Sequence, residues 1–152
     1  MTTDSQQLDD IRALIARAAT PDDAIRGTME YLHGRRPDYH WVGVYRLEGD
    51  TLILGPYVGP ATDHVRIPVG RGVCGTAVAE NRNQVIANVQ ELDNYLSCNL
   101  ETRSEIVVLI REPATGRVLG QIDVDGTRVN AFGHGEESFL ESVAALLAHQ
   151  LA

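Results

Sequence analysis

The spacing of apolar residues changes along the chain, and this change constrains the fold more than any other feature. Apolar residues recur at helical spacing from Leu8 to Ala18, and again from Ile25 to Leu32. From Trp41 onward they alternate, which is the period of a strand with one buried face. A last stretch with helical spacing runs from Glu136 to Leu151. We therefore predict two helices, then a sheet, then a closing helix.

Turn signals divide the middle of the chain into short strands. Glu48-Gly49-Asp50 and the segment 113–116 each separate two alternating runs, as expected for hairpins. The expected elements are helices at 5–18 and from Pro21, strands at 41–45, 51–54, 64–69, 84–88, 105–110 and 117–125, a turn at 70–72, a short helix at 73–81 and a long loop at 89–103. This order is typical of an α+β domain with helices packed on a central, mostly antiparallel sheet.

The length and charge of the chain limit the class of protein. A chain of 152 residues with 43% hydrophobic residues fits one domain, so we expect a single domain over residues 1–152. The net charge of −8 argues against a nucleic acid or an anionic membrane as partner, because phosphate groups need a basic surface. The first residues resemble no export signal and no stretch reaches the ~20 apolar residues of a membrane span, so we expect a cytoplasmic protein.

The chain has two cysteines, and both lie in segments typical of functional sites. Cys74 begins the short helix predicted after Gly70-Arg71-Gly72, where the helix N-terminus and Arg71 would lower the pKa of its thiol. The alternative for Cys74 is a small buried residue under a glycine-rich turn. Cys98 lies in the long loop, and such loops are often functional. In a reducing compartment a bridge between the two would be transient and catalytic or redox-sensing.

Three carboxyl groups lie on the two last strands. The period of two places Val118, Ile122 and Val124 on the core face of the final strand, and Leu119, Gln121, Asp123 and Asp125 on the other face. Two carboxylates on one strand face indicate either a solvated surface or a pocket for a cation. Glu105 shares a strand face with Val107 and Leu109, which favours the pocket. Such a pocket would hold an amine, or keep one carboxyl protonated as a general acid.

The remaining candidates are two aromatic residues and the histidines. Trp41 and Tyr45 lie four residues apart on a predicted strand, so they share a face as an aromatic wall or as ordinary core. The five histidines show no metal-ligand spacing with the cysteines or acids, so we expect no zinc site.

Several sequence blocks taken together resemble one family. They are Trp41–Tyr45, Leu54–Tyr57, Val65–Ala77, Ser97-Cys98, Ser104–Val107 and Ile122–Asp125. Over residues 39 to 127 the chain is similar to the GAF-domain free methionine-(R)-sulfoxide reductases. The resemblance implies a GAF-like domain. Together with the apolar spacing, it gives N-terminal helices at about 5–34, a sheet with active-site loops at about 39–127, and a C-terminal helix at about 136–151.

The resemblance also implies roles for the candidate residues. Cys98 matches the catalytic nucleophile, and Glu105, Asp123 and Asp125 match acids that hold free methionine sulfoxide and polarise its oxygen. Trp41 and Tyr45 match residues that shape the pocket.

The implied activity is reduction of free methionine-(R)-sulfoxide through a cysteine sulfenic acid, without a metal or an organic cofactor. Cys74 would then close a disulfide that thioredoxin or another thiol reopens. GAF domains of this kind are often homodimers, so self-association is among the expected interactions.

Three positions depart from the family pattern. His64 stands where the family has a third cysteine, Asn99 where an acid commonly follows the nucleophile, and Gly126 where serine is usual. The missing thiol leaves an alternative from another class, a GAF domain that binds a small molecule or senses redox state without catalysis.

Overall fold

The computed structural model describes residues 2–93, 95 and 100–152, so Cys98 lies outside the described residues. The helices are α1 (Asp4–Arg17), α2 (Pro21–Arg35), α3 (Gly72–Glu80) and α4 (His134–Leu151), with a short 3-10 helix η1 (Val89–Glu91). The strands are β1 (Trp41–Glu48), β2 (Thr51–Val58), β3 (Arg66–Pro68), β4 (Gln84–Ile86), β5 (Ser104–Arg111) and β6 (Val118–Gly126). None of the helices in the described part of the chain is long and apolar enough to cross a membrane.

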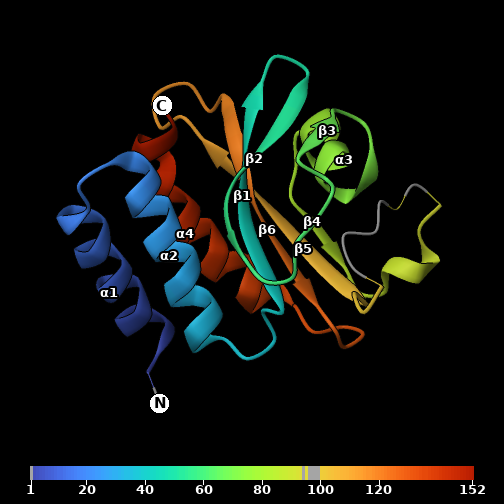
Figure 1. Cartoon of the computed structure of the whole chain (residues 1–152), viewed down its shortest axis with the longest axis horizontal. Coiled ribbons are helices and arrows are strands. Elements are labelled where there is room, and N and C mark those ends of the chain that lie inside the picture. The colour runs from blue at the N-terminus through green and yellow to red at the C-terminus, as the bar shows by residue number, and fades with distance from the viewer. Residues whose placement is uncertain (1, 94, 96–99) are drawn as a thin grey trace.

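The six strands form one sheet in the order β3-β2-β1-β6-β5-β4, and each neighbouring pair is antiparallel. Helices α1, α2 and α4 lie on one side of this sheet, while α3 lies on the other side (Figure 1). The predicted α+β class with a central antiparallel sheet is therefore confirmed. The two central strands, β1 and β6, come from distant parts of the sequence.

Both faces of the sheet are buried. A large apolar cluster fills the space between the sheet and α1, α2 and α4, and includes Ile106, Val108 and Ile110 of β5. A smaller cluster covers the opposite face and includes Val107 and Leu109 of the same strand. The alternation predicted for β5 is confirmed, and the face of β6 that carries the two aspartates is not a solvated surface.

One detail of the predicted alternation is wrong. Ile110 pairs with Gly120, but Arg111 pairs with Val118, so Leu119 is an extra residue in β6. This bulge reverses the alternation at the start of the strand. As a result Leu119 joins the large cluster with Ile122 and Val124, and Val118 packs against the small cluster, the reverse of the sequence prediction.

The predicted bounds of α1 and α3 agree with the structure to within one residue, and α2 begins at Pro21 as predicted, because local signals set these ends. Helix α4 begins at His134, two residues before the predicted Glu136. The Thr20 side chain accepts a hydrogen bond from the Asp23 backbone N–H at 3.0 Å, which caps α2 ahead of Pro21. Asn81 ends α3 in the left-handed conformation with φ of 57°. The predicted strands at 64–69 and 84–88 are shorter, at 66–68 and 84–86.

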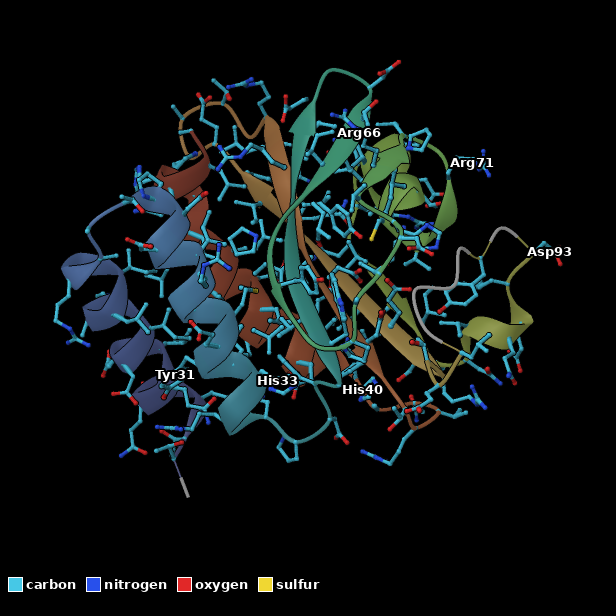
Figure 2. The ribbon with its side chains drawn as sticks, in the orientation of Figure 1. Tyr31, His33, His40, Arg66, Arg71 and Asp93 are labelled. Carbon is cyan, nitrogen blue, oxygen red and sulfur yellow. The ribbon has the colours of Figure 1, made fainter. Side chains whose placement is uncertain are left out.

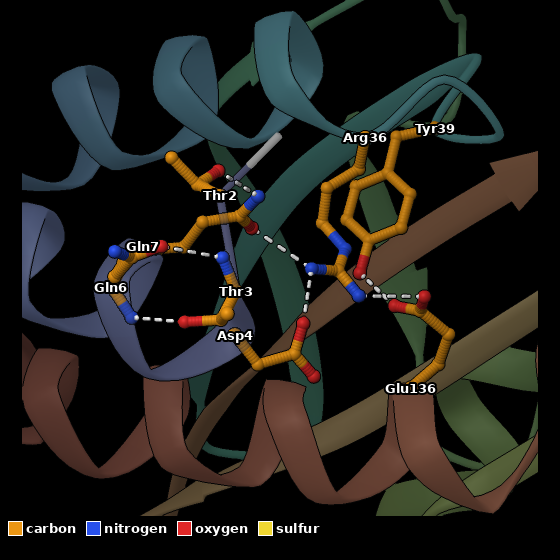
Figure 3. Close-up of polar contacts among 8 residues, drawn as sticks. All are labelled: Thr2, Thr3, Asp4, Gln6, Gln7, Arg36, Tyr39 and Glu136. Atoms are coloured by element: carbon orange, nitrogen blue, oxygen red, sulfur yellow. Dashed lines mark hydrogen bonds and ion pairs between the residues drawn. The ribbon is translucent and has the colours of Figure 1, made fainter.

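A partly buried arginine joins the three helices that cover the large cluster. The Arg36 guanidinium donates to Asp4 Oδ1 at 3.0 Å, to Gln7 Oε1 at 2.8 Å and to Glu136 Oε1 at 2.7 Å (Figure 3). The Tyr39 hydroxyl donates to the other oxygen of Glu136 at 2.6 Å. The same guanidinium lies 3.9 Å from the centre of the Phe139 ring. Arg36 therefore connects α1, α2 and α4 beside the start of β1.

We predict that Arg36→Ala lowers the free energy of unfolding by about 2 to 3 kcal/mol, since hydrogen bonds to charged groups are removed and the Glu136 carboxylate loses its cation. Urea denaturation followed by circular dichroism measures this change. The matched control is Arg12→Ala, because Arg12 and Asp9 form an exposed pair whose removal should cost under about 0.5 kcal/mol. Equal effects of the two changes would contradict the role of Arg36.

Candidate active site

The strand register brings the predicted acids and aromatic residues onto one face of the sheet. Asp125 lies between Trp41 of β1 and Glu105 of β5. In the next row with the same orientation, Asp123 lies between Gly43 and Val107, and in a third row Gln121 lies between Tyr45 and Leu109. Because alternate residues share a face, these side chains point away from the large cluster and toward the side where α3 lies. The three acids thus form a compact cluster in the middle of the sheet.

Cys74 completes this cluster from above the sheet. It lies in the first turn of α3, is 5% exposed, and has its Sγ 3.9 Å from Glu105 Oε2. Its Sγ and one oxygen each of Glu105 and Asp123 all lie within 4.8 Å of one another. The structure therefore places Cys74 both in a buried position and beside the acids, so the two interpretations of this thiol remain open.

Two further side chains bear on the setting of Cys74. The Gln121 amide donates to the Cys74 carbonyl at 3.1 Å and fixes the backbone of this turn. Arg71 is exposed at the outer edge of α3, where its side chain points outward (Figure 2). The arginine charge that the sequence suggested for the thiol is thus directed to solvent.

The aspartates are buried without a fixed hydrogen-bond donor. Asp123 is fully buried and Asp125 is 1% exposed. Among the described residues, no donor bonds to any of their four carboxylate oxygens. Glu105 can form a hydrogen bond with either aspartate only when one of the two carboxyls is protonated. In the same way, Cys74 can form a hydrogen bond with Asp123 only when one partner holds a proton. The arrangement therefore calls for a proton or a bound cation.

Burial determines how these carboxyls titrate. Burial raises the pKa of Asp125 well above its ordinary value, and the nearby Asp123 charge raises it further, while a proton shared with Glu105 opposes the shift. Burial also raises the pKa of Asp123, and protons shared with Glu105 and Cys74 oppose this rise. Such a cluster retains protons into a pH range where exposed aspartates have released theirs.

An aromatic wall borders the acids on one side. Trp41 stacks on Tyr57 with ring centres 5.3 Å apart, and its ring lies 6.4 Å from that of Tyr45. The indole occupies the space above Gly43, where an added Cβ would lie 2.6 Å from Trp41 Cη2. The shared face predicted for Trp41 and Tyr45 is confirmed. No role was predicted for Tyr57, which reaches the wall only because β2 pairs it with Gly43.

Segments that flank Cys98 also lie on this side of the sheet. Leu92 and Tyr95 pack against the small cluster, which includes Trp41, Tyr45 and Cys74. The backbone N–H of Val89 donates to the Arg103 carbonyl at 2.8 Å, and the N–H of Arg103 donates to Gly126 at 2.8 Å. The Tyr45 hydroxyl donates to the His64 carbonyl at 2.8 Å, so the backbone at position 64 borders the aromatic wall. Cys98 itself lies outside the described residues.

The sequence matches a known class of domain, the GAF domain. The match to this family covers residues 20–151 of the chain.

Several relatives define the group more narrowly. The free methionine-R-sulfoxide reductase of Escherichia coli (strain K12) is 39% identical over 143 residues, which cover 94% of this chain and 85% of that protein. The substrate complex of the free methionine-R-sulfoxide reductase from Neisseria meningitidis has a TM-score of 0.90 at 29% identity, covering 97% of this chain and 87% of that one. A substrate complex of fRMsr of Staphylococcus aureus has a TM-score of 0.87 at 33% identity, covering 100% and 97%. The chain therefore belongs to the GAF-domain family of free methionine-R-sulfoxide reductases.

We predict that Gly43→Ala disrupts the aromatic wall, because the new methyl group would overlap the Trp41 ring. Trp41 is the only tryptophan of the chain and is 1% exposed, so its fluorescence reports on the wall directly. Its emission should shift to longer wavelength and become more sensitive to acrylamide. Gly34→Ala is the matched control, since no atom lies within 4 Å of its added Cβ. Identical spectra for both variants would contradict the packing described.

We predict that Asp125→Asn makes the ligand-free protein more stable at pH 8, and that this gain shrinks toward pH about 4. A carboxyl whose pKa is raised in the folded state binds more protons there than in the unfolded state, so stability falls as pH rises from the unfolded pKa through the raised pKa. The asparagine removes this dependence. Urea denaturation across the pH range measures it, with exposed Glu30→Gln as control. A gain independent of pH would contradict the buried-charge explanation.

Proposed function

We propose that this protein reduces the R-sulfoxide of free methionine to methionine. The single observation that supports this most strongly is the buried group of Glu105, Asp123 and Asp125 beside the aromatic wall. The aspartate oxygens lack fixed donors among the described residues, which suits an ammonium group that arrives with the substrate. The names of the relatives and their substrate complexes point to the same compound.

The acids are proposed to bind one end of the substrate. Asp123 and Asp125 hold the ammonium group, and removing one partner of a buried ammonium–carboxylate pair costs roughly 2 to 5 kcal/mol. A peptide-bound methionine has no free ammonium group, so the site selects the free amino acid. Trp41 and Tyr45 pack against the remainder of the substrate and exclude water from it.

The chemical step is proposed to take place at Cys98. Its thiolate attacks the sulfoxide sulfur while Glu105, as a carboxylic acid, gives a proton to the sulfoxide oxygen. Oxygen is transferred, methionine leaves, and Cys98 becomes a sulfenic acid. The substrate sulfur gains two electrons and the cysteine sulfur loses two. Burial beside two other carboxyls favours the protonated form of one member of the group, which is what a general acid requires.

Recycling is proposed to use Cys74. A sulfenic acid condenses with a nearby thiol to give a disulfide and water, and thioredoxin or a small thiol then reduces the disulfide. Since His64 occupies the position of the family's third cysteine, Cys74 is the one other thiol in the sequence that can resolve Cys98.

Release of methionine from the free R-sulfoxide, with thioredoxin or dithiothreitol as donor, tests the function. Cys98→Ser should abolish release, while Cys74→Ser without reductant should still give about one methionine per chain, because Cys98 is the only thiol needed before the sulfenic acid forms. The S-sulfoxide and N-acetylated R-sulfoxide serve as substrate controls. Absence of release from the wild-type protein would favour a non-catalytic GAF binding domain, and full activity of Cys98→Ser would contradict the assigned nucleophile.

A further inference from the structure

Three buried side chains from three different elements place metal-binding atoms next to one another. Cys74 comes from α3, Glu105 from β5 and Asp123 from β6. Their exposed fractions are 5%, 3% and 0%. The sulfur atom and one carboxylate oxygen from each acid all lie within 4.8 Å of one another, with Sγ of Cys74 3.9 Å from Glu105 Oε2.

A fourth buried group, the carboxyl of Asp125, lies beside this cluster. Asp125 lies directly opposite Glu105 in the β5–β6 register, and it is 1% exposed. Neither of its carboxylate oxygens accepts a hydrogen bond from a described donor, and the same holds for both oxygens of Asp123. Four buried oxygens that have no donor among the described residues, beside a thiol, are a costly arrangement unless a proton or a cation accompanies them.

The kinds of atoms present favour one class of cation. Magnesium and calcium prefer oxygen ligands only, whereas a thiolate with carboxylates suits zinc and ions of similar softness. Zinc holds its ligands at about 2.0 to 2.3 Å in a tetrahedron, which puts neighbouring ligand atoms roughly 3.3 to 3.8 Å apart. The 3.9 Å separation of the Cys74 sulfur and the Glu105 oxygen is close to this value. The Asp123 oxygen lies within 4.8 Å of both of these atoms.

We propose that Cys74, Glu105 and Asp123 form a binding site for a thiophilic divalent ion, with Zn²⁺ as the expected ion, and that the ion reversibly inhibits the enzyme. The inhibition rests on the proposed function, because the ion would occupy the acids assigned to the substrate ammonium. It would also hold the Cys74 thiolate and prevent it from forming a disulfide with Cys98. The binding site itself does not depend on that function.

Binding is tested by titrating the reduced, chelator-treated protein with Zn²⁺ in a calorimeter, and with Cd²⁺ while its ultraviolet cadmium–thiolate band is recorded. We expect about one ion per chain with micromolar or tighter affinity. Asp123→Asn should weaken affinity at least about tenfold, as expected for removal of a ligand. The cadmium band should persist in Cys98→Ser and disappear in Cys74→Ser, which assigns it to one thiol. His134→Ala, which removes an exposed imidazole, is the control and should bind normally.

Three results would overturn the site. They are no binding below millimolar concentration, a band that follows Cys98 and not Cys74, and binding unchanged in Asp123→Asn, which would mean an adventitious ion only. Should Cys74→Ser fail to fold, Asp123→Asn and Cys98→Ser still decide the question.

Inhibition is measured separately, in single-turnover methionine release without a thiol reductant. We expect Zn²⁺ to compete with the sulfoxide and a chelator to restore release. Binding with the predicted variant pattern but without competition would leave the metal site intact and overturn the assignment of these acids to the substrate. Turnover without any metal binding would overturn the metal site and leave the proposed function intact.

Discussion

The burial of two aspartates in the central strand is the constraint on which the rest of the structure depends. Asp123 and Asp125 lie in β6, which is covered by β1 and β5 at its edges and by packed side chains on both faces. Nothing described near them supplies a fixed donor. This arrangement costs stability, and the large apolar cluster between the sheet and α1, α2 and α4 offsets that cost. One side of the sheet therefore stabilises the fold, and the other carries the buried acids of the candidate site.

The pairing of β1 with β6 creates the site. It puts Trp41 next to Asp125 and Gly43 next to Asp123. Since Gly43 has no side chain, the indole of Trp41 folds into the space above it and stacks on Tyr57. The aromatic wall and the acids are thus held by the same backbone hydrogen bonds. A substrate with an ammonium group at one end and an apolar chain beside it would place the ammonium group on the acids and the chain on the aromatic wall.

Sequence reasoning succeeded where the signal was local and failed where it depended on distant partners. The cap at Thr20 and the alternation of Val107 and Leu109 were readable because neighbours in the sequence decide them. The faces of Val118 and Leu119 were predicted wrongly because a bulge inserts one residue, and alternation by itself cannot locate it. The Arg36 network was missed altogether, since its partners Asp4 and Glu136 lie far away in the chain.

The sequence by itself determined the α+β class, most of the helix boundaries and a set of candidate residues, because periodicity, capping and residue chemistry are properties of short segments. It also indicated that Glu105, Asp123 and Asp125 belong together, but left open whether their strand face was solvated. Only the tertiary structure decided that this face is buried and that Cys74 lies over the acids. It also decided that Gln121 bonds to the Cys74 carbonyl and that Tyr57 stacks on Trp41. Those facts follow from which strands become neighbours, and strand order is set by packing across the whole chain, which no local pattern contains.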